Sequence, residues 1–257
     1  MWTYNGIDLI NKAWVVEEID GFGIPGLKGK NTNLAGADGE RWVKKMFESR
    51  RMPFKMRVIG VNPLTGEIDS TARAHLEANI DYLIGLLSTR KLNQLIRTMS
   101  DMSKRIAQAE VAGEIFFAGG DMTNYADFVV EFNLPDPHFY AETQRTIALP
   151  AGTKVVANPG TAESERFDIT LTGPLTNPKI TNTTNGVWLQ LGGELTDGQT
   201  AIINTYDFTV TIGGVSVLSA LTHGQDYRWL VLESGNNTLK LEGGAGSAEL
   251  KYYPAYF

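Results

Sequence analysis

The chain has 257 residues, a formal charge of -6, 42% hydrophobic and 20% charged side chains, which is the composition of a folded globular protein with one large domain or two modest ones. That apolar content excludes a disordered chain. The 27 glycines have no Gly-X-Y period, so they indicate many turns and exclude collagen. The absence of cysteine excludes disulfides, thiol catalysis, and zinc or iron–sulfur sites with Cys ligands.

The charge is distributed unevenly along the chain. Residues 1–155 carry 18 Lys and Arg against 19 Asp and Glu, whereas residues 156–257 carry 5 against 10. Neither half has the basic surplus that phosphate binding requires, so no sequence-specific nucleic-acid binding is expected. The shift in composition suggests two domains, 1–155 and 156–257. We expect no signal peptide and no membrane span, because no run approaches the roughly 18 apolar residues of a span.

The first half is predicted to contain strands and one helix. Residues 13–19 favour a strand, and a loop rich in Gly, Asn and Lys is expected from Ile24 to Glu40. The segment Arg41–Val61 gives two strand-like runs, and its basic residues are interpreted as the solvated face of a sheet. Apolar residues at helical spacing then predict a helix that begins near Asp69 or Ser70, ends near Ser88 and packs on a sheet.

Residues 91–113 fit two structures. The segment combines good helix formers with alternation of apolar and polar residues, and Ser100–Ser103 resembles a turn. The polar tetrad between two strand-length runs favours a long hairpin over a helix. A half-buried strand is predicted at Tyr125–Phe132, and Pro135 and Pro137 break it because neither can donate to a ladder.

The second half is predicted to be an antiparallel β-sandwich. Short strands recur about every 8 to 12 residues with Gly, Asn and Asp turns between them, and no helix is expected. The expected strands contain Phe167–Leu171, Val187–Leu191, Ile202–Ile203, Phe208–Ile212, Tyr227–Val231, Leu239–Leu241 and Leu250–Tyr252.

Catalytic motifs are weak in this sequence. Gly21–Gly26 reads G-x-G-x-x-G, but Pro25 and a further loop stand where a dinucleotide-binding helix should begin. His75, His138 and His223 show no metal-ligand spacing, and no G-x-S-x-G elbow is present. We therefore predict no catalytic residue, no cofactor and no metal.

Two acidic groups keep a hydrolase open as an alternative, since paired carboxylates serve glycosidases. They are Glu163, Glu165 and Asp168 in one group, and Glu17, Glu18 and Asp20 in the other. Each group lies at a strand boundary, where solvated acids are ordinary, so a structural role is favoured.

Aromatic residues of the second half allow a carbohydrate-binding or adhesin protein as another alternative. Trp188, Tyr206 and Trp229 are candidates for stacking against sugar rings. They fit a sandwich core equally well, because strand aromatics usually point inward.

The order of features in the first half resembles the distal tail proteins of long, non-contractile-tailed bacteriophages. Ile7-Asp8 is followed by glycine-bearing loops at Gly23–Gly26 and Gly36–Gly39, then by a basic β-stretch, one helix and a hairpin-like region. A strand then ends in Phe132–Tyr140, with the D-P-x-F-Y corner that closes the first domain in that family.

The second half is similar to the galectin-like C-terminal domain of the same family. It opens with Asn158–Ala162, continues with a strand at Phe167–Gly173, and reaches Leu232–Leu239 before the final strands. Ser234 stands where the family usually has proline. The fold class is therefore mainly β: an N-terminal sandwich or barrel-like domain with one helix and a long hairpin, then a galectin-like sandwich.

The resemblance implies a non-enzymatic, structural virion protein of the tail tip, or baseplate. It implies a homo-hexameric ring that joins the tail tube protein to the tail-associated hub or fibre protein. The first domains would line the channel for DNA and the tape measure protein, and assembly would occur in the host cytoplasm. A ring subunit needs a segment that docks on its neighbour, and the candidate contacts are Leu95, Met99, Met102 and Ile106 in the 91–113 region.

Overall fold

The computed structural model describes residues 1–33, 38–62, 64–117, 123–224 and 228–257. Gly36, Ala37 and Tyr227, which the sequence singled out, lie outside these ranges. The chain divides into two compact units, residues 1–139 with Phe257, and residues 140–256. Each unit is built mainly from antiparallel strands, which confirms the mainly β class.

The division falls earlier than the expected boundary at 155/156. Strands β13 (Arg145–Pro150) and β14 (Gly152–Asn158) pair with β24 (Ser247–Tyr252) and β23 (Gly235–Gly244) of the second unit. Segment β12 (Phe139–Ala141) stands at the division. Composition places the boundary later because the charge of the chain changes after these two strands, whereas their backbone pairing already belongs to the sandwich.

The first unit holds one extended sheet, one helix and a separate hairpin. Its elements are β1 (Trp2–Tyr4), β2 (Ile7–Asp8), β3 (Trp14–Ile19), β4 (Leu27–Lys28), β5 (Thr32–Asn33), β6 (Glu40–Arg41), β7 (Met46–Phe47), β8 (Arg50–Ile59), α1 (Ala72–Leu87), β9 (Asn93–Thr98), β10 (Lys104–Ala112) and β11 (Tyr125–Leu134). The sheet order is β2-β1-β9-β10-β11-β8-β3. The predicted strands at 13–19 and 125–132 and the hairpin at 91–113 are therefore confirmed.

The sheet folds over itself around an aromatic core. Trp2 of β1 meets Phe54 of β8 with ring centroids 5.1 Å apart, and Tyr4 meets Phe132 of β11 at 4.8 Å. Phe54 and Phe132 also contact each other edge to face at 5.0 Å. Burying large rings contributes strongly to stability, so the two ends of the sheet are held face to face by β1 packing on β8 and β11.

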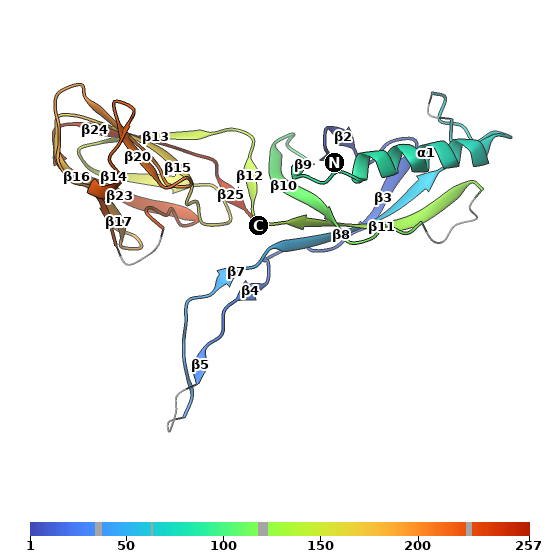
Figure 1. Cartoon of the computed structure of the whole chain (residues 1–257), viewed down its shortest axis with the longest axis horizontal. Coiled ribbons are helices and arrows are strands. Elements are labelled where there is room, and N and C mark those ends of the chain that lie inside the picture. The colour runs from blue at the N-terminus through green and yellow to red at the C-terminus, as the bar shows by residue number, and fades with distance from the viewer. Residues whose placement is uncertain (34–37, 63, 118–122, 225–227) are drawn as a thin grey trace. The chain divides into compact units, whose positions relative to one another are not determined.

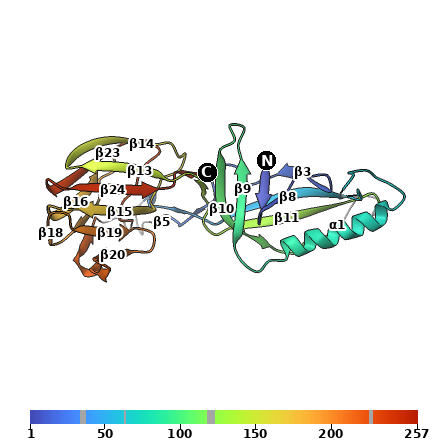
Figure 2. The same cartoon turned by 90° about the horizontal axis from the view of Figure 1, so that it is seen from above.

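Helix α1 packs against β8, as its apolar stripe predicts, and Figure 2 shows it running alongside β8 and β11. Leu76 and Leu83 are buried, and the amide of Asn79 donates to the carbonyl oxygens of Ile59 and Val61 at 2.8 and 3.3 Å. Gly60 permits this approach, since a Cβ there would strike the backbone carbonyl of Ala72, the first residue of α1.

The second unit is a two-sheet antiparallel sandwich, as predicted (Figure 1). Its sheets have the orders β13-β24-β15-β19-β20-β21 and β14-β23-β16-β17-β22, with β18 paired to β16. The remaining elements are β15 (Phe167–Thr172), β16 (Leu175–Asn182), β17 (Val187–Leu191), β18 (Glu194–Leu195), β19 (Thr200–Asn204), β20 (Thr209–Ile212), β21 (Val215–Ser216), the single 3-10 turn η1 (Leu218–Ala220), β22 (Leu221–His223), β23 (Gly235–Gly244), β24 (Ser247–Tyr252) and β25 (Ala255–Tyr256). Inward-facing residues of both sheets form one core, which includes Ile169, Leu189 and Leu250.

Two sequence predictions for the chain are wrong. The expected loop from Ile24 to Glu40 contains β4 and β5, which pair with β7 and β6. The strand expected at Tyr227–Val231 is absent from its described residues, 228–231, where Trp229 and its neighbours enter the core without a ladder. The large residues at these positions are therefore buried in the core but do not pair with a neighbouring strand.

Candidate assembly surfaces

Residues 24–33 and 38–47 contain two short strand pairs that project from the sheet of the first unit (Figure 1), and we call these residues the arm. Among the described residues, the strands of the arm pair only with each other: Leu27 lies opposite Phe47, and Thr32 lies opposite Arg41. Among the described residues of the arm, Pro25 alone is buried. A lone two-stranded hairpin is marginally stable in water, so the arm draws little stability from its own unit.

The root of the arm, in contrast, is fixed to the sheet. Arg50 at the start of β8 is buried, and its Nη2 donates to the carbonyl oxygen of Gly23 at 2.9 Å. Burial lowers the pKa of the Arg50 guanidinium. Phe47 packs against His138 and Phe257, with ring centroids 5.9 and 4.9 Å apart. The root of the arm is therefore held by contacts within the first unit.

The described part of the arm exposes large apolar side chains. Trp42 is 70% exposed and Ile24 is 74% exposed. The other exposed apolar residues are Leu27, Val43 and Met46. Clustered exposed apolar side chains mark interaction sites more often than scattered ones do.

Basic residues accompany these apolar side chains. The arm carries five cations, Lys28, Lys30, Arg41, Lys44 and Lys45, and two carboxylates, Asp38 and Glu40. Its formal charge is thus +3 in a chain of -6. The interleaving of apolar and basic residues in the sequence from Leu27 to Met46 is the signal that could have found the arm.

The predicted interface residues of the 91–113 region separate into two groups. Leu95 is fully buried inside the first unit, while Met102 at the hairpin tip is 76% exposed. Met99 and Ile106 are half-buried. Because β9 pairs with β1 and β10 pairs with β11, this hairpin is part of the sheet and does not need a neighbour to complete it. Met102, with Met99, remains available to a partner.

The structure brings two of the three stacking candidates together. Tyr206 and Trp229 line one cavity of about 180 Å³, together with Phe208 and Arg166. Trp229 is only 6% exposed and packs in the sandwich core, whereas Tyr206 is 56% exposed. Arg166 lies over the Tyr206 ring, 4.0 Å from its centroid. Sugar stacking at this cavity would therefore depend mainly on Tyr206 and Phe208.

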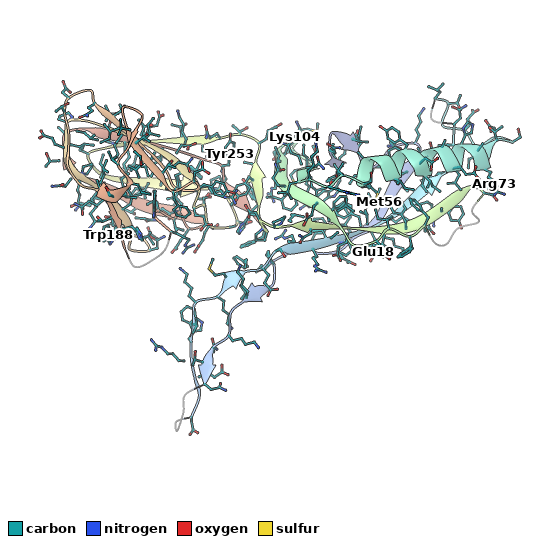
Figure 3. The ribbon with its side chains drawn as sticks, in the orientation of Figure 1. Glu18, Met56, Arg73, Lys104, Trp188 and Tyr253 are labelled. Carbon is teal, nitrogen blue, oxygen red and sulfur yellow. The ribbon has the colours of Figure 1, made fainter. Side chains whose placement is uncertain are left out.

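Trp188 lies elsewhere. It stands on β17 at the surface of the second unit (Figure 3), with Lys179 Nζ 4.3 Å from its ring centroid. The three aromatic residues do not form one platform.

Five of the six acidic candidates for a hydrolase engage in ion pairs or hydrogen bonds. Glu163 and Glu165 both pair with Arg228, while Asp168 accepts a hydrogen bond from Asn204 Nδ2 at 2.8 Å. Glu17 pairs with Arg57 at 3.1 Å, and Glu18 lies 4.0 Å from Lys55. These contacts give the carboxylates structural partners.

The three histidines lie in separate surroundings. His75 contacts Thr71 and Asp69 at the start of α1, His138 contacts Asp136, and His223 contacts the carbonyl of Gly224. No cluster that could hold a metal ion occurs among the described residues. Within the same residues, no helix has the length and apolar character to cross a membrane. Gly21–Gly26 leads into the arm and is followed by β4.

The chain is thus a two-unit β protein whose first unit carries the exposed arm. Residues 159–256 match the family described as siphovirus-type tail component, C-terminal domain. The second unit is therefore similar to the C-terminal domain of siphovirus-type tail components, which confirms the resemblance to distal tail proteins for this part of the chain.

Solved structures extend the likeness in fold to the whole chain. The crystal structure of the SPP1 Dit (gp 19.1) protein, described as a paradigm of hub adsorption apparatus in phages that infect Gram-positive bacteria, aligns with a TM-score of 0.69 and 16% identity. That alignment covers 100% of this chain and 98% of the other. Two structures of the phage P2 baseplate in its activated conformation, with Ca and with Sr, align at 12% identity over 95% of this chain and 92% of theirs, with TM-scores of 0.40 and 0.41. No curated protein matches the sequence.

These findings show a second unit similar to the C-terminal domain of siphovirus-type tail components, and a fold that the whole chain shares with SPP1 Dit.

Proposed function

We propose that this protein forms a homo-hexameric ring at the distal end of the phage tail, where it joins the tail tube protein to the hub or fibre protein. The observation that carries the proposal is the match of residues 159–256 to a siphovirus tail component, together with a fold shared over the whole chain with SPP1 Dit. The exposed arm supports it, because a subunit of an assembly needs surfaces that are covered only in the assembly.

In this proposal the first units form the ring and line the channel for DNA and the tape measure protein, while the second units project outward. The role is structural and not enzymatic. The partners found for Glu163, Glu165 and Asp168 support a structural role for these acids. The two domains act in the virion, after assembly in the host cytoplasm.

Sedimentation velocity combined with negative-stain microscopy tests the proposal. The expected species is a ring of six copies of the 28.2 kDa chain, formed in a concentration-dependent way. Immunogold labelling of intact phage should place the protein at the tip of the tail. The proposed function would be contradicted if the chain stayed monomeric at all concentrations and the immunogold label were absent from the tail.

A further inference from the structure

We propose that the second unit binds one pyranose ring of a neutral glycan in the cavity beside Tyr206 and Phe208. This inference goes beyond the proposed ring function and does not depend on it, because every residue of the site belongs to one unit of one chain. It selects a single place among the aromatic candidates of the sandwich and leaves out Trp188, which does not line this cavity.

The first step of the argument is the turn between β19 and β20, which holds two exposed aromatic rings. Tyr206 is 56% exposed and Phe208 is 47% exposed. The backbone amides of Tyr206 and Asp207 both donate to Asn204 Oδ1, at 2.9 and 2.6 Å. Asn204 is itself oriented by the hydrogen bond from its Nδ2 to Asp168. A turn fixed in this way loses little conformational entropy when its rings meet a ligand.

The second step is the backbone of Phe208. Its φ is 54°, in the left-handed region that favours glycine. Bulky residues in this region are strained, and such strain clusters at ligand-binding sites. The Phe208 ring meets Trp229 edge to face with the centroids 5.1 Å apart, and both residues line the cavity. A strained conformation that presents an apolar ring at a cavity, and not in the core, points to a ligand.

The third step is the polar lining, which fits hydroxyl groups because these both donate and accept hydrogen bonds. Arg166 and Arg228 supply N–H donors, and Glu165 supplies carboxylate acceptors. Glu165 lies 3.7 Å from Arg228, but its side chain is 42% exposed, so it can still accept from a ligand. Arg166 lies 4.0 Å from the Tyr206 ring centroid, which places a donor beside an apolar surface. A pyranose offers the same combination, a C–H face with a rim of hydroxyls.

The fourth step is charge and size, which narrow the ligand to a neutral sugar. Glu163 also pairs with Arg228, so two carboxylates balance the two guanidinium groups at the cavity. This balance gives an anionic ligand no electrostatic advantage. The volume of about 180 Å³ lies below the roughly 300 to 1,000 Å³ of pockets for drug-sized ligands. The cavity therefore admits one ring of a glycan, with a dissociation constant on the order of 1 mM.

Saturation-transfer difference NMR with methyl pyranosides tests the inference on the full chain. The panel contains the methyl glycosides of glucose, galactose, mannose, rhamnose and N-acetylglucosamine, each at about ten times the expected dissociation constant. We expect transfer of saturation to the ring C–H protons of at least one glycoside. Absence of transfer to every member of the panel would overturn the inference.

Variants of Tyr206 assign the signal to the cavity. Tyr206→Ala should weaken binding of the best glycoside about tenfold, because it removes a stacking ring. Tyr206→Phe keeps the ring and should bind as the wild type does. The matched control Tyr253→Ala removes a 43% exposed tyrosine of the same unit from outside the cavity, and it should also leave binding unchanged. Equal binding by Tyr206→Ala and the wild type would overturn the inference.

Phe208→Gly separates binding from folding. Glycine adopts a positive φ without strain, so the turn should persist and the variant should unfold at a urea concentration close to that of the wild type. Binding should nevertheless fall about tenfold, since the second ring is lost. If this variant binds the glycoside as tightly as the wild type, the Phe208 ring is not part of a sugar site.

Competition with inorganic phosphate distinguishes a neutral ligand from an anionic one. Phosphate at the concentration of the glycoside should leave the saturation transfer unchanged, because the charges at the cavity are balanced. Displacement of the glycoside by phosphate would contradict the neutral-sugar assignment. These measurements need only a single copy of the chain, so their failure leaves the proposed ring function standing, and failure to form rings leaves the sugar site standing.

Discussion

The first unit contains two long hairpins with opposite relations to the rest of the molecule. In the β9–β10 hairpin, both strands have neighbours in the sheet, β1 on one side and β11 on the other, and Leu95 is fully buried. In the described part of the arm, the strands pair only with each other, and Leu27 is exposed. The difference shows that a β-hairpin of this unit is either part of the core or exposed, depending on whether its apolar side chains meet partners in the same chain.

The largest expected effect separates the two hairpins by the same chemical change. Leu95→Ala should lower the free energy of unfolding by about 3 kcal/mol, because it leaves a cavity in the core. The matched control Leu27→Ala should change it by less than about 0.5 kcal/mol, since that side chain already meets solvent. Urea unfolding followed by tryptophan fluorescence measures both; equal losses would show that the arm is packed like the hairpin.

A smaller effect is expected at the root of the arm. Arg50→Ala removes a buried side chain and its hydrogen bond to the Gly23 carbonyl, and should lower the free energy of unfolding by about 2 kcal/mol. Arg51→Ala is the control, since Arg51 is exposed and its pair with Glu131 spans 3.3 Å at the surface. Hydrogen exchange should quicken at the Glu48 amide in Arg50→Ala alone. If the two variants behave alike, the arm does not depend on this anchor.

The smallest effect concerns the charged face of the sheet into which the arm runs. Arg57 on β8 forms two hydrogen bonds with Asp127 on β11, at 2.7 and 3.1 Å, and these hold the pKa of Asp127 below its ordinary value of 3.8. Asp127→Asn should cost about 1 kcal/mol at pH 6, an amount limited by the partial exposure of both side chains.

The sign of the pH dependence follows from that lowered pKa. Because the folded state favours the ionised carboxylate, its contribution is complete above the ordinary pKa and is lost as pH falls through the lower folded value. The gap between wild type and Asp127→Asn should therefore close below pH 3.8 and stay constant from pH 5 to 7. Exposed Asp81→Asn provides the control. A gap that persists unchanged at pH 2.5 would show that the ion pair is not its source.

Much of the fold followed from the periodicity of buried elements. Leu76 and Leu83 mark α1 at helical spacing, and Phe54, Met56 and Val58 mark β8 at strand spacing, because each set must face one core. The structure of the 91–113 segment is harder to predict from sequence, because its local propensity is helical whereas its pairing with β1 and β11 makes it a hairpin. Tertiary pairing decides such cases.

The arm could not be predicted in the same way. Its strands are two residues long, so they carry no alternation, and Gly23 and Gly29 with positive φ resemble ordinary loop residues. Because most described apolar residues of the arm are exposed, its sequence shows no alternation of buried and exposed positions that could predict strands. The arrangement of the stacking candidates could not be predicted for a related reason. Trp188 and Trp229 both lie in the sandwich, but the sequence alone does not distinguish an outward-facing position on a strand from a core residue that lies outside any strand.

The position of the basic residues bears on how the protein survives before assembly. Lys28, Lys30, Arg41, Lys44 and Lys45 give a trypsin-like protease five cleavage sites in one extended, surface segment. Under the proposed ring function, a copy whose arm is covered in the assembly hides these sites, while an unassembled copy is cut there first. Degradation would then remove unassembled subunits from the pool and spare those already built into a tail.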